Sequence, residues 1–143
     1  MATKTKEQIS YNMQRVRGKD SRIELLLRKE LWRRGLRYRK NVQGIEGKPD
    51  IAFLGKKVAV FCDSEFWHGY NWEERKDDFK SNRDFWIPKI ERNIMRDVTV
   101  NAVLEYDGWT VLRFWGREIE KDVRGCADIV ETALRDAGAK PRP

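Results

Sequence analysis

Residues 49–63 read PDIAFLGKKVAVFCD. Two short apolar runs, 50–54 and 58–62, are separated only by a tight glycine-containing turn, and this pattern predicts an antiparallel β-hairpin. Asp50 begins the first strand and Asp63 lies just beyond the second. Because neighbouring antiparallel strands bring these two ends together, we expect the two carboxylates to converge.

The segments on either side of the hairpin predict three helices and two further strands. Helix signals occur at a capping-box pattern from Ser21 to Glu24 and at a later apolar stripe, in which Pro88 fits the first turn. The expected elements are a helix ending at Gly35, strands over 36–41 and 109–115, and helices over 84–106 and 122–137. Together they predict a single α/β domain, in which helices flank a small mixed sheet.

The composition predicts a basic globular protein. The chain has 143 residues, 40% of them hydrophobic, which is enough for one domain with a buried core. No apolar run approaches the roughly 18 residues that a membrane span needs, and no secretory segment follows the N-terminus. Cys62 and Cys126 are too far apart to indicate a disulfide framework or a cysteine-based zinc site. We therefore expect a reduced, cytoplasmic protein without a membrane partner.

Positive charge is concentrated in the N-terminal third of the chain. The net charge is +7, and residues 15–40 alone hold eleven basic and three acidic side chains. Such a patch is typical of proteins that bind a polyanion, although it also suits a solvated helix face. We expect residues 1–19 to form a flexible basic arm, 20–137 the folded domain and 138–143 a disordered tail.

The hairpin acids are candidate metal ligands. Two close carboxylates repel each other, and a hard divalent cation such as Mg²⁺ is their natural compensation. Glu24, on the preceding helix, is suited to complete the site, although its place in the capping box explains it equally well. A cation held near Asp50 and Asp63 would polarise a phosphodiester and activate water.

His68 is the only histidine of the chain and ends the aromatic run Phe66–Trp67–His68. A lone histidine is most often a surface or capping residue, but next to a metal–carboxylate centre a neutral imidazole is suited to act as the general base. The adjacent rings of Phe66 and Trp67 lie in a turn-like stretch and do not both pack inward easily. Side chains of this kind are used as wedges between base steps of DNA.

Several short motifs occur in one order along the chain. They are SYNM (10–13), RGKD (17–20), GKPDI (47–51), FWH (66–68), FW (85–86), NIMRD (93–97) and GW (108–109). In order and spacing, this set resembles the very short patch repair endonucleases from about residue 10 to Trp115. The resemblance implies a restriction-endonuclease-like fold of the PD-(D/E)xK type and Mg²⁺-dependent nicking of duplex DNA.

The resemblance also implies roles for individual residues. The metal-binding aspartate of the family matches Asp50, a metal-binding backbone carbonyl matches that of Cys62, and the catalytic base matches His68. The positions matched by Glu24 and Asp97 also belong to the site, and Asp63 is a catalytic candidate from the hairpin spacing. The aromatic wedge matches Phe66, Trp67 and Trp86, and an inserting methionine of the arm matches Met13. From the basic charge of the arm, we expect Arg15, Arg17 and Lys19 to contact phosphates.

Some positions depart from the family pattern. Well-known members hold a structural zinc through cysteine and histidine, whereas the matching positions here are Glu65, Tyr70, Trp72 and Gly116. Only one of these offers a ligand, so we expect no zinc site. A glycine of the family is replaced by Ser64, and a position that holds histidine in many members and aspartate in others is Asp63. These departures bear on substrate choice more than on the chemistry.

The spacing Asp63-x-Glu65 supports a competing assignment of the base. Many restriction-like nucleases follow Pro-Asp with Asp/Glu-x-Lys, and glutamate occasionally replaces the lysine. If strand geometry continued that far, Asp63 and Glu65 would point to the same side, and Glu65 would replace His68 as the base. We favour His68, because the Phe-Trp-His match is complete.

The sequence thus predicts a Mg²⁺-dependent endonuclease that nicks one strand of double-stranded DNA at or near a T:G mismatch. A site-specific nickase of homing or restriction type, which needs no mismatch, is an alternative. A non-catalytic DNA-binding module is a further alternative, although intact Asp50, His68 and Asp97 argue against it. We expect a monomer that acts at the nucleoid, with mismatch-repair proteins as partners.

Overall fold

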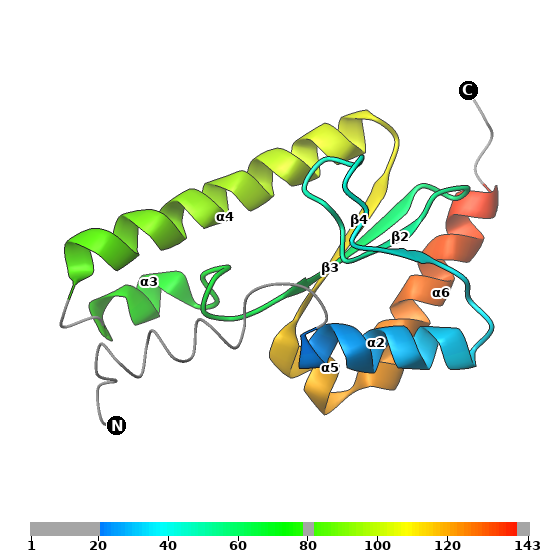
Figure 1. The fold of residues 1–143 in the computed structure, drawn as a ribbon, viewed down its shortest axis with the longest axis horizontal. Coiled ribbons are helices and arrows are strands. Elements are labelled where there is room, and N and C mark those ends of the chain that lie inside the picture. Colours follow the sequence, from blue (N-terminus) through cyan, green and yellow to red (C-terminus); the bar gives the residue numbers. More distant parts are fainter. Residues whose placement is uncertain (1–20, 79–81, 140–143) are drawn as a thin grey trace.

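The computed structural model describes residues 21–78 and 82–139. Its centre is a four-stranded mixed sheet in the order β1-β2-β3-β4 (Figure 1). The strands are β1 (Arg39–Lys40), β2 (Ile51–Phe53), β3 (Val58–Asp63) and β4 (Thr110–Trp115). β2 pairs antiparallel with both β1 and β3, whereas β4 runs parallel to β3.

Helices cover both faces of the sheet, so the domain has three layers (Figure 1). They are α2 (Arg22–Arg33), α3 (Trp72–Arg75) with the following 3-10 turn η1 (Lys76–Asp78), α4 (Arg83–Tyr106), α5 (Gly116–Lys121) and α6 (Val123–Ala139). α4 lies on one face, and α2, α5 and α6 pack on the other. The long helix α4 is the crossover that allows β3 and β4 to be parallel neighbours.

Strand β3 is buried along its whole length because both of its faces are covered. Val58, Val60 and Cys62 pack toward α2 and α6, in a core that includes Leu27 and Leu31. Ala59 and Phe61 point the opposite way and pack against Val100 and Leu104 of α4. The alternation of side chains along a strand therefore assigns each β3 residue to one of two cores.

The structure confirms the hairpin, the mixed sheet and the single small α/β domain. The long helix predicted over 84–106 begins one residue earlier and ends where expected. α6 extends to Ala139, two residues beyond the predicted end of the domain.

Other expectations need correction. The strand predicted over 36–41 shortens to two residues, since it is an edge strand with exposed side chains. Ser21 precedes α2 but makes no side-chain capping bond, and Glu24 is buried rather than turned back to the helix start. Pro88 lies in the second turn of α4, not the first. The short helices α3 and α5 were not expected, because four to six residues carry too little periodicity to be recognised.

The predicted DNA-contacting residues of the arm, Met13, Arg15, Arg17 and Lys19, lie outside the described residues, as do residues 140–143 of the predicted tail. In the described part of the chain, no helix combines the length and the apolar character that crossing a membrane requires.

Leu31→Ala is expected to destabilise the domain by about 2–5 kcal/mol, because Leu31 is fully buried between α2 and the sheet. Urea unfolding followed by circular dichroism measures this change. Leu25→Ala is the matched control in the same helix: with Leu25 53% exposed, it should change the free energy of unfolding by less than about 0.5 kcal/mol. Equal losses in the two variants would contradict this packing.

Candidate active site

One open cleft of about 1380 Å³ contains most of the predicted site residues. It is bounded by the start of α2, the start of β2, the end of β3, the loop over 64–71, the middle of α4 and the helix α5. The predicted residues that line it are Glu24, Asp50, Cys62, Asp63, Phe66, Trp67, His68 and Asp97. The fold thus gathers side chains from four separate segments, and of the predicted residues that the structure describes only Trp86 lies elsewhere.

The hairpin brings Asp50 to the end of β3, as its register requires. Ile51 pairs with Val60, and Asp50 Oδ2 accepts a 2.7 Å hydrogen bond from the amide of Cys62. Burial raises the pKa of Asp50 to about 7, aided by the nearby Glu24 and Asp63 and opposed by the Cys62 amide. Three carboxylates therefore share a poorly hydrated region, and this donor set fits a hard cation.

Glu24 faces the same region from α2. It is only 4% exposed, and its Oε2 lies 3.6 Å from Arg28 of the next helical turn. The interaction of Glu24 with Asp50 contributes to the raised pKa of Asp50. The structure thus places Glu24 at the acid cluster and not in a capping box.

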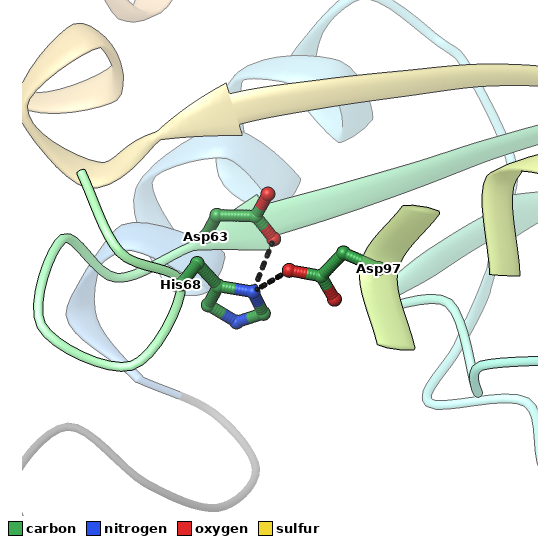
Figure 2. Close-up of side chains that lie close together, drawn as sticks. All are labelled: Asp63, His68 and Asp97. Atoms are coloured by element: carbon green, nitrogen blue, oxygen red, sulfur yellow. Dashed lines mark hydrogen bonds and ion pairs between the residues drawn. The ribbon is translucent and has the colours of Figure 1, made fainter. Parts of the chain in front are cut away.

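His68 forms the second part of the site, beside Asp63 and Asp97 (Figure 2). Its Nδ1 lies 2.5 Å from Oδ2 of Asp97 and 3.6 Å from Oδ1 of Asp63. Since a carboxylate only accepts hydrogen bonds, the bond to Asp97 requires a proton on Nδ1. In the neutral ring, Nε2 is then unprotonated, and Figure 2 shows it pointing away from both acids.

The loop that carries His68 is fitted closely to α4. Gly69 follows His68 with a φ of +72°, in the left-handed region that favours glycine, and a Cβ there would collide with the side chain of Ile94. Asn93 donates a 3.3 Å hydrogen bond to the carbonyl of Trp67. These contacts hold the imidazole against the turn of α4 from which Asp97 projects.

The charges around His68 act in opposite directions on its pKa. Burial favours the neutral ring, but the hydrogen bond to Asp97 and the charges of Asp63 and Asp97 outweigh it and raise the pKa of His68 above its ordinary value. Burial likewise raises the pKa of Asp63, against the opposing effects of His68 and Arg113. The site thus stabilises an imidazolium once one has formed.

Two groups of residues have the composition of a metal site. Within the described ranges, Asp63, His68 and Asp97 can bring three ligand atoms within 4.8 Å of one another. There, however, Nδ1 of His68 is already engaged by Asp97. The alternative is the cluster of the three acids Asp50, Glu24 and Asp63, which lies beside the backbone of Cys62.

Glu65, the competing candidate base, is placed differently. β3 ends at Asp63, so strand geometry does not extend to Glu65. Its Oε2 accepts a 3.0 Å hydrogen bond from the amide of Arg117 at the start of α5. Its backbone carbonyl accepts bonds from Arg75 at 2.9 Å and from the amide of Tyr70 at 3.0 Å. Glu65 therefore ties the loop to α5.

The other positions that match zinc ligands of the family also have protein partners. Tyr70 packs edge-on against Trp115 with ring centroids 5.1 Å apart, and Arg117 lies over its ring. Trp72 donates a 3.0 Å bond to Glu91 of α4. A Cβ at Gly116 would lie 3.2 Å from Glu65. Direct contacts therefore join this loop to its surroundings.

The proposed wedge residues belong to an aromatic cluster beside the cleft. Phe66 lies edge-on to Trp67 at 5.7 Å and to Trp86 at 6.1 Å, and Trp86 is buried. Within 21–78 and 82–139, the buried indole N–H groups of Trp67 and Trp86 have no hydrogen-bond partner. Phe85, which the sequence places in the FW motif but which was not assigned to the wedge, contacts Trp86 and is 54% exposed. Its only signal was its place beside Trp86.

Arg113 is a second residue that sequence reasoning missed. It donates to both oxygens of Asp63, at 3.2 and 3.3 Å. The signal available was its position in an apolar strand, TVLRFW, where a charge must have a partner.

Comparison with known proteins defines the class: the chain is a DNA endonuclease. It belongs to the family of DNA mismatch endonuclease Vsr, whose model matches residues 1–74.

The type II nicking enzyme V.NmeDIP of Neisseria meningitidis serogroup C is 52% identical over 132 residues, which cover 92% of this chain and 89% of that protein. The type II nicking enzyme V.HpaIIP of Haemophilus parainfluenzae is 53% identical over 106 residues, covering 74% and 75%. The DNA mismatch endonuclease Vsr of Escherichia coli K12 is 29% identical over 127 residues, covering 89% and 78%.

The two candidate bases are distinguished by substitution. His68→Ala is expected to slow DNA cleavage by about 10²–10⁴-fold, the usual effect of losing a general base. Glu65→Gln should leave the rate within a few fold of the unsubstituted protein, because Glu65 bonds to the start of α5. Single-turnover rates at saturating protein measure both effects. A larger loss in Glu65→Gln than in His68→Ala would assign the base to Glu65.

Proposed function

We propose that this endonuclease nicks one strand of duplex DNA at or near a T:G mismatch, in a reaction that depends on Mg²⁺. The observation that carries the proposal is the proximity of two units in one cleft: the buried acids Glu24 and Asp50, and the hydrogen-bonded pair His68–Asp97. The names of the relatives, type II nicking enzyme and DNA mismatch endonuclease, support it.

In this proposal Asp50 and the backbone carbonyl of Cys62 hold Mg²⁺, in the manner of restriction-like nucleases. The oxygen donors fit a hard cation, and the repulsion among Asp50, Glu24 and Asp63 would be relieved by one. When bound, the ion supplies a positive charge that polarises the scissile phosphate and offsets charge in the transition state. No zinc is part of the proposal, since Glu65, Tyr70 and Trp72 have protein partners.

His68 is the proposed base. Its Nε2 takes a proton from the attacking water while Nδ1 stays bonded to Asp97, so one carboxylate fixes the tautomer and stabilises the imidazolium. Asp63 adds a second negative charge at 3.6 Å. Glu24 is proposed to orient water at the opposite side of the acid cluster.

DNA binding is assigned to the basic N-terminal third and to the aromatic cluster. Arg15, Arg17 and Lys19 would contact phosphates, so affinity should fall steeply with salt. Met13 and the rings of Phe66, Trp67 and Trp86 would enter the base stack. The indole N–H groups of Trp67 and Trp86 lack hydrogen-bond partners among the described residues. Moving these rings out of the aromatic cluster toward DNA would give the N–H groups access to hydrogen-bond acceptors, which favours the movement.

Asp50→Asn is expected to abolish nicking of a supercoiled plasmid in Mg²⁺, as EDTA should with the unsubstituted protein. The substitution removes a charged ligand but can keep the bond to the Cys62 amide, so folding and most DNA binding should persist. Asp136→Asn, on the exposed side of α6, is the control and should nick normally. Substantial activity in Asp50→Asn would exclude Asp50 as the metal ligand.

A nickase that recognises a site without a mismatch is the alternative, favoured by the relatives named type II nicking enzymes. Fluorescent duplexes that differ by a single T:G pair test it directly. We expect faster nicking of the mismatched duplex, because unstacking costs less where pairing is already weakened. Equal rates on both duplexes would favour the alternative.

Trp67→Ala tests whether the wedge contributes to this choice. If Trp67 enters the base stack, its loss should change the rates on matched and mismatched duplexes by different factors. Trp32→Ala removes a 52% exposed tryptophan of α2 and serves as the control, with no change in the ratio of rates. An unchanged ratio in Trp67→Ala would leave this ring as a packing residue of the cleft wall.

A further inference from the structure

We propose that Arg113 is a positioning residue of the nuclease site, which holds Asp63 and Asp97 in place around Nδ1 of His68. This inference rests on the proposed role of His68 as the base. Arg113 does not line the cleft, and no contact with DNA is assigned to it.

The guanidinium of Arg113 bridges the two carboxylates. Its Nη1 lies 3.2 and 3.3 Å from the oxygens of Asp63 and 3.5 Å from Oδ1 of Asp97. Because Arg113 approaches Oδ1 of Asp97, Oδ2 of Asp97 is left for the 2.5 Å bond to His68. One cationic group thus contacts both acids that flank the imidazole. It reaches both oxygens of Asp63, and it reaches the oxygen of Asp97 that does not bond to His68.

Arg113 is itself fixed from two further directions. Its Nε donates a 2.7 Å hydrogen bond to Oδ1 of Asn101, and its guanidinium carbon lies 4.1 Å from the ring centroid of Phe61. Its side chain is only 17% exposed. An arginine held by an amide, an aromatic face and two carboxylates has little freedom, so it can define where the carboxylates lie.

The fold explains this arrangement. In the parallel register Arg113 of β4 is opposite Phe61 of β3, and the alternation along β3 turns Phe61 and Asp63 to the same face, toward α4. Asp97 and Asn101 are four residues apart and so project from one side of α4. Arg113 therefore spans the layer between sheet and helix where the site is assembled.

The charge of Arg113 also has a defined effect. The charged groups that act on His68 are Asp63 from β3, Asp97 from α4 and Arg113 from β4. Two carboxylates facing one imidazole favour its protonated form, in which Nε2 has no lone pair to accept a proton. Arg113 opposes them and lowers the pKa of His68, which keeps part of the population available as a base.

Because the chain has one histidine, NMR of the full-length protein observes His68 without ambiguity. Imidazole ¹⁵N and ¹³C shifts of protein without added metal give both the tautomer and the titration, and do not depend on nicking. In Arg113→Met we expect a smaller fraction of the Nδ1–H tautomer and a pKa of His68 shifted upward. Nicking at neutral pH should fall by about 10–100-fold in kcat with little change in KM.

Arg113→Lys and Arg34→Met complete the experiment. Lysine keeps the charge but not the planar fork, so the pKa of His68 should remain near that of the unsubstituted protein while kcat stays reduced. Arg34 also bonds to several carboxylates, but between α2 and α6, and its loss should leave the imidazole signals unchanged. If Arg113→Met does not fold, the tautomer of His68 and kcat are measured in Arg113→Lys instead.

The proposal is overturned if folded Arg113→Met, or Arg113→Lys in its place, shows the tautomer of the unsubstituted protein together with its kcat. A failure of the proposed function is seen separately. If His68→Ala nicks normally, His68 is not the base, whereas the NMR comparison still reports whether Arg113 orders the carboxylates.

Discussion

The pairing of β3 with a strand on each side is the constraint on which the site depends. β2 fixes one edge of β3 in an antiparallel register and brings Asp50 to the amide of Cys62. β4 fixes the other edge in a parallel register, which sets Arg113 opposite Phe61, two pairs before the end of β3. A slip of one residue in either pairing would turn the polar side chains into the opposite core. The hydrophobic alternation of β3 therefore positions the chemistry.

The site concentrates negative charge in a region with little water. Glu24 and Asp63 are each only 4% exposed, and Asp50 has a pKa raised to about 7. Buried carboxylates are tolerated when something of opposite charge is near. Arg28 and Arg113 provide part of this compensation from within the protein. The negative charge that these arginines leave uncompensated is the physical reason to assign a cation to Asp50. The same cation would stabilise the buried acids and take part in the proposed reaction.

The loop that carries His68 is held in place by direct protein contacts. Where the resemblance leads one to look for zinc ligands, the loop is held by Glu65 at the start of α5, by Arg75 at two carbonyls and by the Tyr70–Trp115 ring contact. These bonds restrain the backbone on both sides of His68. A base must be held within narrow limits to be effective, so these restraints suit the role proposed for His68.

Part of the fold and of the site is predictable from the sequence. The hairpin and the long helix follow from local apolar patterns, and the convergence of Asp50 with the end of β3 follows from the hairpin, because its partners are adjacent in the chain. Residue chemistry alone suggested Glu24 and His68 as additions to the hairpin acids, but Asp97 entered only through the resemblance, since 29 residues separate it from His68. No local pattern encodes contacts over such spans.

Only the tertiary structure decided which acids and bases face each other. It assigned Glu24 to the acid cluster over a capping box, placed Glu65 at α5, and paired Arg113 with Asp63 across 50 residues of chain. Local hydrophobic periodicity determined the elements, because each element buries its own apolar face. The partners of the polar side chains depended on how β3, β4 and α4 pack, because a buried charge is stabilised by whatever the assembled fold brings within a few ångströms.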